Sequence, residues 1–250
     1  MTDAMRAETV TITGNEGAEI EAYLAVPLDG PPAGGVVVIH HMPGYDAGTK
    51  EITRRFAANG YLAICPNLYS REAPGASPDD AAATVRASGG VPDERLVGDV
   101  AGAIEYLRAL PGSNGKFATI GYCSGGRQSF LAACSLELDA AVDCYGAFVV
   151  APPPVGMPLK WTPIVHLSAK LSCPLLGLFG AEDSRPSPAE VGELEDALRE
   201  HDKTFEFHVY PDAGHAFNAD YRQSYVPSAA EDGWHRMQEW FNRHGASATP

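Results

Sequence analysis

The chain has 250 residues, a hydrophobic fraction of 45%, a charged fraction of 20% and a formal net charge of −14 at pH 7. This length and composition suit one globular domain with a substantial core, expected over residues 1–250 with the core at about 8–243. The negative charge argues against a nucleic acid or an anionic membrane as partner. The sequence contains no apolar run of about 18 residues, so we expect no membrane span. Residues 1–11 lack the apolar stretch of a secretory signal, so we expect a cytoplasmic protein that is a monomer or a small homo-oligomer.

Apolar runs alternate with helical patterns along nearly the whole chain. Segments 8–13 and 18–26 flank a Gly-rich turn and predict an antiparallel hairpin at one edge of a sheet. The other expected strands lie at 35–40, 61–65, 116–120, 140–145, 173–179 and 204–210. Helices are expected at 49–59, 80–88, 93–110, 127–135, 187–201 and 228–243. Segment 150–163, which has five prolines, predicts a surface loop, and residues 245–250 predict a frayed tail.

Such an alternation predicts the α/β class, with a doubly wound, mainly parallel sheet and helices on both faces. In sheets of this kind, ligands bind beyond the carboxyl ends of the strands. Cys123, Asp183 and His215 each follow the carboxyl end of an expected strand. We therefore expect these three side chains to meet on one rim of the sheet.

The segment that organises this rim is Ile-Gly-Tyr-Cys-Ser-Gly-Gly at 120–126. A strand, the pattern Gly-x-Cys-x-Gly and a helix predict a nucleophile elbow with sulfur in place of the usual Ser oxygen. Small glycines let the chains approach closely, and the N-terminus of the following helix favours a thiolate. The simpler interpretation is that Cys123 is a small core residue, because buried and inert cysteines are common.

The chain has five cysteines, which are scattered and form no C-x-x-C pair. An odd number without regular spacing is typical of a reducing compartment rather than of a disulfide framework. Four of them lie in or beside apolar runs and are expected in the core: Cys65, Cys134, Cys144 and Cys173. Cys123 alone lies in a turn that would expose it.

These residue types predict nucleophilic catalysis. Cys123 would attack the substrate, His215 would accept and return the proton, and Asp183 would orient the imidazole and stabilise its cation. The order Cys, Asp, His matches the nucleophile, acid, base order of α/β-hydrolases. Glu182 is the alternative acid. The oxyanion hole is expected from the backbone N–H groups of Ser124 and Met42.

Other polar residues near the expected strand ends have weaker signals. His40 and His41 are adjacent and would face apart on a strand, and no nearby cluster completes a metal site, so no metal is expected. A role in the pocket wall or in hydrogen bonding suits one of them better. Arg71 and Arg222 are candidates for binding an anionic part of a substrate, and Tyr145 is a further candidate at a strand end.

With these residues assembled, the chain resembles the dienelactone hydrolase (carboxymethylenebutenolidase) family, within the α/β-hydrolase fold, from about residue 20 to 242. The segments that carry the resemblance are Val37–His40, Cys65–Tyr69, Gly121–Gly126, Phe179–Asp183 and Ala213–Phe217. The resemblance implies an esterase or lactonase without a cofactor, which opens a small ester or lactone through a thioester acyl-enzyme.

In one position the chain departs from that family. Family members usually carry Glu directly after the strand-end His or its equivalent, where it helps to ionise the Cys, and here that position is His41. Arg71 falls in the arginine-bearing loop of the family, which implies contact with a substrate carboxylate.

Three alternatives remain open from the sequence. The same scaffold could act on aryl esters or organophosphate triesters, which the change to His41 would allow. A ligand-binding homologue without catalytic activity is a second possibility, although an intact Cys123, Asp183 and His215 set argues against it. A redox-sensing thiol protein is a third, which would require a resolving cysteine near Cys123, but Cys134, eleven residues on, lies within an expected helix and is expected to be buried.

Overall fold

The structure is a computed structural model that describes residues 5–247. Its strands are β1 (Met5–Thr13), β2 (Glu19–Pro27), β3 (Ala33–Ile39), β4 (Leu62–Pro66), β5 (Ser113–Tyr122), β6 (Ala140–Cys144), β7 (Leu175–Gly180) and β8 (Phe205–Tyr210). Its α-helices are α1 (Ala47–Ala58), α2 (Pro78–Ser88), α3 (Asp93–Arg108), α4 (Ser124–Ala133), α5 (Pro188–Glu200) and α6 (Pro227–Arg243). Two short 3₁₀ helices complete the set, η1 (Asn15–Gly17) and η2 (Val165–Lys170).

All eight strands form one sheet in the order β1-β2-β4-β3-β5-β6-β7-β8. Strand β2 pairs antiparallel with β1 and β4, whereas every other neighbouring pair is parallel. The mainly parallel α/β fold and the antiparallel edge hairpin predicted from the sequence are therefore confirmed. Strands β3 and β6 are buried along their whole length, as expected for β-branched and apolar runs with helices on both faces.

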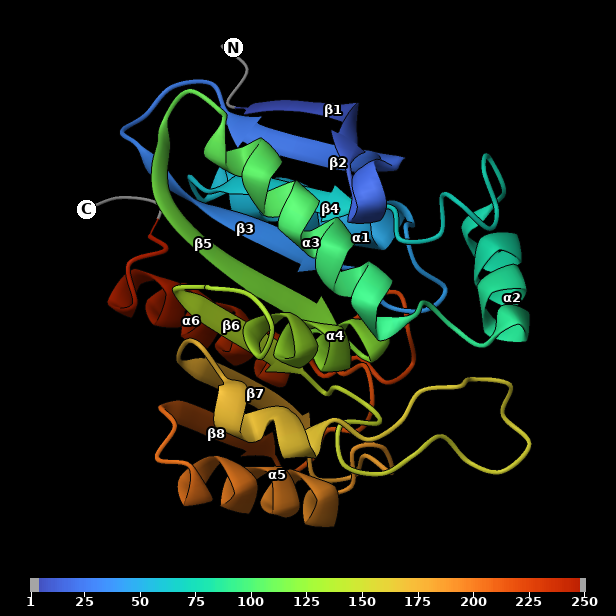
Figure 1. Ribbon diagram of the computed structural model, residues 1–250. Coiled ribbons are helices and arrows are strands. Elements are labelled where there is room, and N and C mark those ends of the chain that lie inside the picture. Colours follow the sequence, from blue (N-terminus) through green and yellow to red (C-terminus); the bar gives the residue numbers. More distant parts are fainter. Residues whose placement is uncertain (1–4, 248–250) are drawn as a thin grey trace.

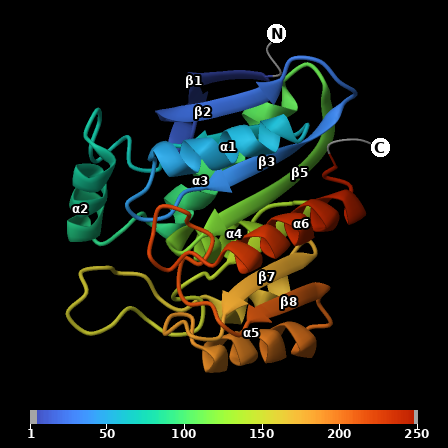
Figure 2. The same ribbon diagram turned by 180° about the vertical axis from the view of Figure 1, so that it is seen from behind.

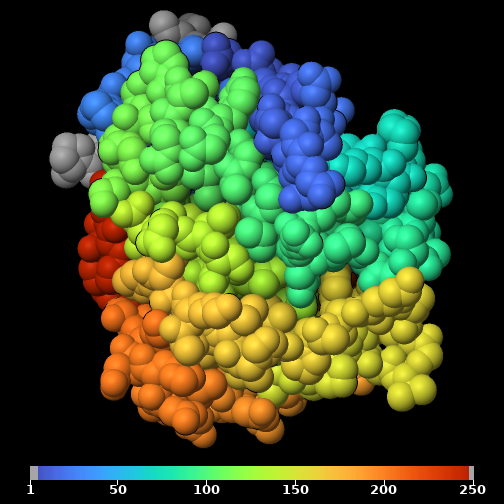
Figure 3. Space-filling model, in the orientation of Figure 1, coloured from blue at the N-terminus to red at the C-terminus, as the bar shows by residue number. Residues whose placement is uncertain are grey.

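Helices cover both faces of the sheet (Figures 1 and 2). One apolar core packs α3, α4 and α5 against the first face, and a second core packs α1 and α6 against the other. Figure 3 shows the first face, with α2 and the loop of residues 150–163 at its right-hand edge. The backbone of this loop is hydrogen-bonded to the end of α2: the Lys160 N–H donates to the carbonyl of Gly89 at 2.8 Å.

Local signals explain where the helices begin. Asp46 caps α1 by accepting a hydrogen bond from the Thr49 N–H at 2.8 Å, and Ser187 and Glu190 form a capping box at the start of α5. Helix α4 begins at Ser124, three residues earlier than the sequence pattern predicts. The glycines that we assigned to the turn instead lie in the first turn of this helix.

The C-terminal segment corrects one expectation. Residues 248–250 lie outside the described part of the chain, but residues 245–247 are not frayed. Ala246 is fully buried, and the carbonyl of Ser247 accepts a hydrogen bond from the Gly34 N–H at 2.8 Å. The end of the chain therefore packs beside the start of β3. Among the described helices, none combines the length and the apolar character that a bilayer crossing requires.

Candidate active site

Cys123 stands in a strained turn between β5 and α4. Its backbone has φ 57° and ψ −120°, a region that costs a non-glycine residue on the order of 1–3 kcal/mol. Two hydrogen bonds hold this turn: the Cys123 N–H donates to the carbonyl of Cys144 at 3.0 Å, and the Gly126 N–H donates to the carbonyl of Cys123 at 3.0 Å. The turn leaves the Cys123 side chain partly exposed, whereas the other cysteines are buried.

Close packing of backbone explains why this turn needs glycine. A Cβ at Gly121 would lie 1.8 Å from the carbonyl oxygen of Gly125, and a Cβ at Gly125 would lie 2.3 Å from the carbonyl oxygen of Ile39. Backbone atoms cannot withdraw as a flexible side chain can, so either substitution would displace the turn. The glycine pattern that we interpreted as an elbow is therefore required by the geometry around Cys123.

The acid and the imidazole come from the two strands beyond. Asp183 follows β7, His215 follows β8, and His215 Nδ1 lies 2.7 Å from Asp183 Oδ2. The other oxygen of Asp183 accepts a hydrogen bond from the Arg185 N–H at 2.8 Å, which fixes the carboxylate. Asp183 is buried, whereas Glu182, the alternative acid, is exposed.

The electrostatics of His215 depend on both neighbours. Burial disfavours the imidazolium, but hydrogen bonds to Asp183 and Cys123 outweigh this effect and raise the pKa of His215 to about 10. The raised pKa favours the protonated ring at neutral pH, and this ring lines the same cavity as the Cys123 sulfur. A cationic imidazole beside a thiol is the environment that favours a thiolate.

A second feature of this rim is a pair of unused N–H donors. Neither the N–H of Met42 nor that of Ser124 donates a hydrogen bond to any atom of residues 5–247. Met42 follows β3, and Ser124 is the first residue of α4. The two donors belong to the loops that flank Cys123, where an oxyanion hole is expected.

His40 orients one of these donors. Burial lowers the pKa of His40 to about 4, so its ring is neutral at physiological pH. Its Nε2 accepts a hydrogen bond from the Leu68 N–H at 3.2 Å, and its Nδ1–H donates to the carbonyl of His41 at 3.0 Å. In a planar trans peptide the C=O and N–H point in opposite directions, so holding the His41 carbonyl also fixes the direction of the Met42 N–H.

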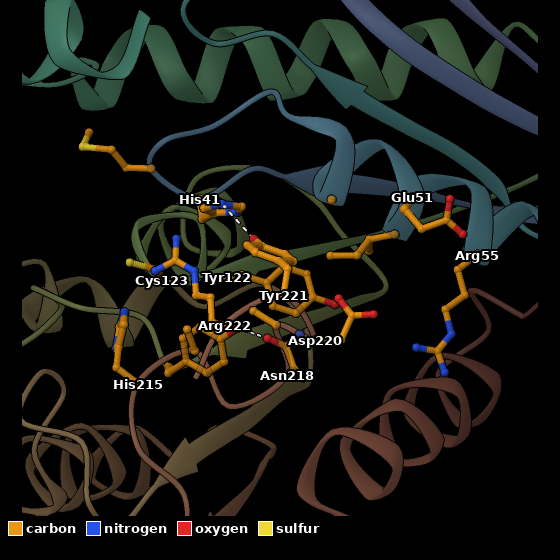
Figure 4. A pocket seen from close by; sticks show the side chains of 16 residues that line it. His41, Glu51, Arg55, Tyr122, Cys123, His215, Asn218, Asp220, Tyr221 and Arg222 are labelled. Atoms are coloured by element: carbon orange, nitrogen blue, oxygen red, sulfur yellow. Dashed lines mark hydrogen bonds between the residues drawn. The ribbon is translucent and has the colours of Figure 1, made fainter. Parts of the chain in front are cut away.

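Cys123 and His215 open into one cavity of about 140 Å³. Figure 4 shows this cavity, with His41 and Cys123 on one side and Glu51 and Arg55 of α1 on the other. The loop that follows His215 forms a further wall and contributes Tyr221 and Arg222, and Tyr145 lines the cavity from the end of β6. Within the described residues, no group of three or more His, Cys, Asp or Glu side chains could hold a metal ion.

The sequence model of the dienelactone hydrolase family matches residues 20–245. The chain belongs to this family. Two proteins named "Putative carboxymethylenebutenolidase" are similar to it: one from Yersinia pestis is 37% identical over 245 residues, covering 96% of this chain and 90% of that protein. The other, from Escherichia coli K12, is 38% identical over 239 residues, covering 92% of this chain and 85% of that protein.

Solved structures agree with this assignment. A crystal structure named "Putative Dienelactone Hydrolase", from Klebsiella pneumoniae, has a TM-score of 0.84 and 33% identity and covers 96% of this chain and 100% of that chain. A structure named as a dienelactone hydrolase-like promiscuous phosphotriesterase, from metagenomic libraries, has a TM-score of 0.77 at 20% identity, a similarity of fold, and covers 97% of this chain and 99% of that chain. The chain is therefore a hydrolase of the dienelactone hydrolase type, with the α/β-hydrolase fold.

In this member of the dienelactone hydrolase family, only some of the candidate substrate-binding residues line the cavity. His41, Tyr145 and Arg222 line the cavity beside Cys123. Arg71 does not: its guanidinium pairs with the buried Asp99 through two hydrogen bonds of 2.7 and 2.8 Å. In the structure this arginine balances a carboxylate in the core and does not line the cavity, so substrate binding by Arg71 stays a prediction.

His41 has a carboxylate partner that sequence reasoning missed. His41 Nε2 lies 3.1 Å from Asp46 Oδ2 and 3.4 Å from the hydroxyl of Tyr221. Although burial acts in the opposite direction, the hydrogen bonds from His41 and Thr49 lower the pKa of Asp46 to about 2. The family position that usually holds Glu thus contains an imidazole backed by a half-buried aspartate. The sequence signal for Asp46 was its place before α1, which indicates a helix cap and not a partner for His41.

Asp143 is a buried carboxylate behind the elbow that the sequence analysis did not single out. It lies on β6 and is fully buried, and burial raises its pKa to about 7 in spite of a hydrogen bond from the Gly146 N–H at 2.7 Å. Its Oδ2 has no hydrogen-bond partner within residues 5–247. An added Cβ at Gly126 would lie 2.3 Å from Asp143 Oδ1, so the carboxyl group packs directly against the first turn of α4.

We expect Asp143→Asn to remove a pH-dependent loss of stability. The pKa of Asp143 is higher in the folded protein, about 7, than its ordinary value of 3.8, so folding favours the protonated form. Its contribution to stability is therefore fully present below pH 3.8 and is lost as the pH rises through 7, by about 4 kcal/mol in all, of which about 3 kcal/mol is lost between pH 5 and pH 8. Urea unfolding at pH 5 and pH 8 measures this difference, which should be smaller in the variant by about that amount. Asp196→Asn, at an exposed carboxylate on α5, is the control, and parallel wild-type and Asp143→Asn curves would contradict the prediction.

Proposed function

We propose that Cys123, His215 and Asp183 act as nucleophile, base and acid in the hydrolysis of small esters or lactones through a thioester acyl-enzyme. The observation that carries this proposal is geometric: His215 Nδ1 lies 2.7 Å from Asp183 Oδ2, and His215 lines the same cavity as the thiol of the strained elbow. In this arrangement His215 would accept the proton of the Cys123 thiol and later return it to the leaving group.

In the acylation step, the sulfur of Cys123 attacks the carbonyl carbon and a C–S bond forms. The carbonyl oxygen becomes an oxyanion, which would accept hydrogen bonds from the N–H groups of Met42 and Ser124. When the oxyanion collapses, the C–O bond to the leaving group breaks, and His215 gives its proton to that oxygen. The products are a thioester on Cys123 and a free alcohol, or in a lactone the opened hydroxyl end of the same molecule.

In the deacylation step, neutral His215 takes a proton from a water molecule as that water attacks the thioester carbon. The second oxyanion occupies the same pair of N–H groups. Its collapse breaks the C–S bond and releases the carboxylic acid, leaving the thiolate of Cys123 beside the imidazolium of His215. Asp183 stabilises this cation in both steps and holds the ring in one orientation.

The substrate would lie against His41, Tyr145 and Arg222. Arg222 extends from the loop after His215 toward the side of the cavity that holds Cys123 (Figure 4), so its guanidinium is placed to bind an anionic group of the substrate. The small volume of the cavity favours small esters or lactones over polymers.

A broader esterase or organophosphate triesterase is the second candidate function. The observation that favours it is His41, which stands where the family usually has Glu. An imidazole lacks the fixed negative charge of a carboxylate, so the wall beside Cys123 would repel the negatively polarised oxygens of a phosphotriester less. One structural relative carries the name of a promiscuous phosphotriesterase, although at 20% identity it supports the fold alone.

A substrate panel tests the proposal. Dienelactones, p-nitrophenyl esters and a phosphotriester would be compared at equal concentration, and acid-quenched samples would be examined by intact mass with peptide mapping. We expect turnover of lactones and activated esters, with an acyl adduct on Cys123. Turnover of the phosphotriester alone would favour the second candidate. No turnover of any substrate by folded protein would instead favour a ligand-binding homologue.

A further inference from the structure

A second cavity adjoins the first and has no role in the chemistry described above. It has a volume of about 330 Å³ and lies between α1, α6 and the sheet. We propose that this cavity binds the apolar acyl chain of an ester whose carbonyl carbon reacts with Cys123. The proposal rests on the proposed function and specifies its substrate as an ester with a chain too long for the first cavity.

The two cavities share one boundary. Six residues line both of them: Ile52, Arg55, Tyr122, Tyr145, Asn218 and Asp220. The Tyr145 hydroxyl donates a hydrogen bond to Asn218 Oδ1 at this boundary; the dashed line that ends at Asn218 in Figure 4 marks this bond. The first cavity, at about 140 Å³, is below the range of about 300–1,000 Å³ found for small-molecule sites, whereas the second reaches it. A substrate with a long chain would therefore need the second cavity.

The inner wall of the second cavity is apolar, whereas polar side chains form its outer part. Leu178 of β7 and Phe217 line it from the sheet side, and Trp234 and Met237 line it from α6. All four side chains are buried. Burying a chain against them would contribute roughly 0.8 kcal/mol for each methylene group removed from water.

Small residues on α6 create the space. Ala230 and Gly233 lie on the same helical face as Trp234 and Met237, at spacings of three and four residues. Gly233 is not required by tight packing, because an added Cβ would meet only Leu178 Cδ1 at 3.4 Å and the Tyr210 hydroxyl at 3.5 Å. A larger side chain on this face would enter the cavity instead of clashing with the backbone.

Charged side chains stand at the mouth and mark its boundary with water. Arg55, Asp220 and Glu231 all line the cavity and are all exposed. The Arg55 guanidinium lies 3.9 Å from the centre of the Trp234 ring and so covers part of the apolar interior. An apolar chain would fit between these charged side chains and the sheet.

The acyl side of the ester is assigned to this cavity because of where His215 stands. His215 must reach the leaving-group oxygen to protonate it, so the leaving group has to lie beside His215. His215 and Cys123 line the first cavity but not the second. The part of the substrate that extends past Tyr122 and Tyr145 is therefore the part that remains bound to sulfur.

The test is Ala230→Phe, which fills the second cavity and leaves the first unchanged. We expect kcat/KM for p-nitrophenyl octanoate to fall by about tenfold or more, whereas kcat/KM for p-nitrophenyl acetate stays within about twofold. Ala109→Phe is the matched control, since Ala109 is exposed at the end of α3, which packs on the other face of the sheet. An equal loss of kcat/KM for both esters, or no loss for either, would overturn the proposal. Octyl acetate carries its long chain on the alcohol side, so a loss of activity confined to this ester would place the alcohol in the second cavity and would also overturn the proposal.

Binding without turnover separates this proposal from the proposed function. In the Cys123→Ala background, sodium octanoate is expected to change the tryptophan fluorescence, because Trp234 lines the second cavity. Adding Ala230→Phe should abolish that change. If octanoate binds in this way but Cys123→Ala does not reduce ester hydrolysis, the thioester mechanism fails and the cavity assignment stands. If octanoate produces no change in a protein that hydrolyses p-nitrophenyl acetate through Cys123, the cavity assignment fails alone.

Discussion

Cys123→Ala should lower kcat/KM for p-nitrophenyl acetate by about 10⁴-fold or more, because no other group in the cavity can form the thioester. His215 and the two N–H donors would remain, so a small residual rate above that in water is expected. The variant should fold, since alanine is smaller than cysteine and the two backbone hydrogen bonds of the turn do not involve the thiol. Steady-state kinetics with the folded state checked by circular dichroism measure this effect.

The matched control for that variant is Cys173→Ala. Cys173 is buried just before β7 and does not line the cavity, and burial raises the pKa of its thiol to about 12, so it cannot act as a nucleophile near neutral pH. Its replacement should leave kcat/KM within about twofold while costing some stability. An unchanged rate in Cys123→Ala, with intact fold, would remove the proposed mechanism and leave only the family-level assignment.

Asp183→Asn is expected to reduce kcat by about 10⁴-fold, an effect of the size seen when the acid of a comparable triad is replaced by its amide. Asn cannot stabilise the imidazolium, and its NH₂ group favours the wrong tautomer of His215. The hydrogen bond that His215 Nδ1–H donates to Asp183 is the leading interaction that raises the pKa of His215 to about 10, so this pKa should fall in the variant. The pH dependence of kcat and NMR titration of His215 measure the two consequences separately.

Glu182→Gln is the matched control, because Glu182 is the adjacent carboxylate and was the alternative acid. It is exposed and has no hydrogen bond to His215 in residues 5–247, so we expect kcat to remain within about twofold. A large loss in Glu182→Gln together with a small loss in Asp183→Asn would exchange the two roles. A loss in Asp183→Asn without any change in the titration of His215 would show that the aspartate acts through the fold and not through the imidazole.

The features that the sequence predicted correctly depend on residues that are close together in the chain. The elbow around Cys123 depends on glycines at fixed offsets, whose effect is steric and local, and the strand ends before Asp183 and His215 follow from apolar runs bounded by turn residues. In a parallel sheet the carboxyl ends of neighbouring strands share one edge. The distance of 2.7 Å between Asp183 and His215 therefore realises a juxtaposition that pattern and topology together predicted.

What the tertiary structure alone decided is which partner each polar group takes. Arg71 lies in a loop that suggested substrate binding, but its partner, Asp99, is 28 residues away on α3 and was visible in the sequence only as a polar residue on a helix. The pairing of His41 with Asp46, and the cavity between α1 and α6, likewise depend on how separate elements pack. Glycine turns and strand ends are encoded in neighbouring residues, so the sequence by itself determined the fold and the turn that holds Cys123. Hydrogen bonds and cavities form between surfaces that meet only after folding, so the tertiary structure alone decided the walls of the cavity around Cys123.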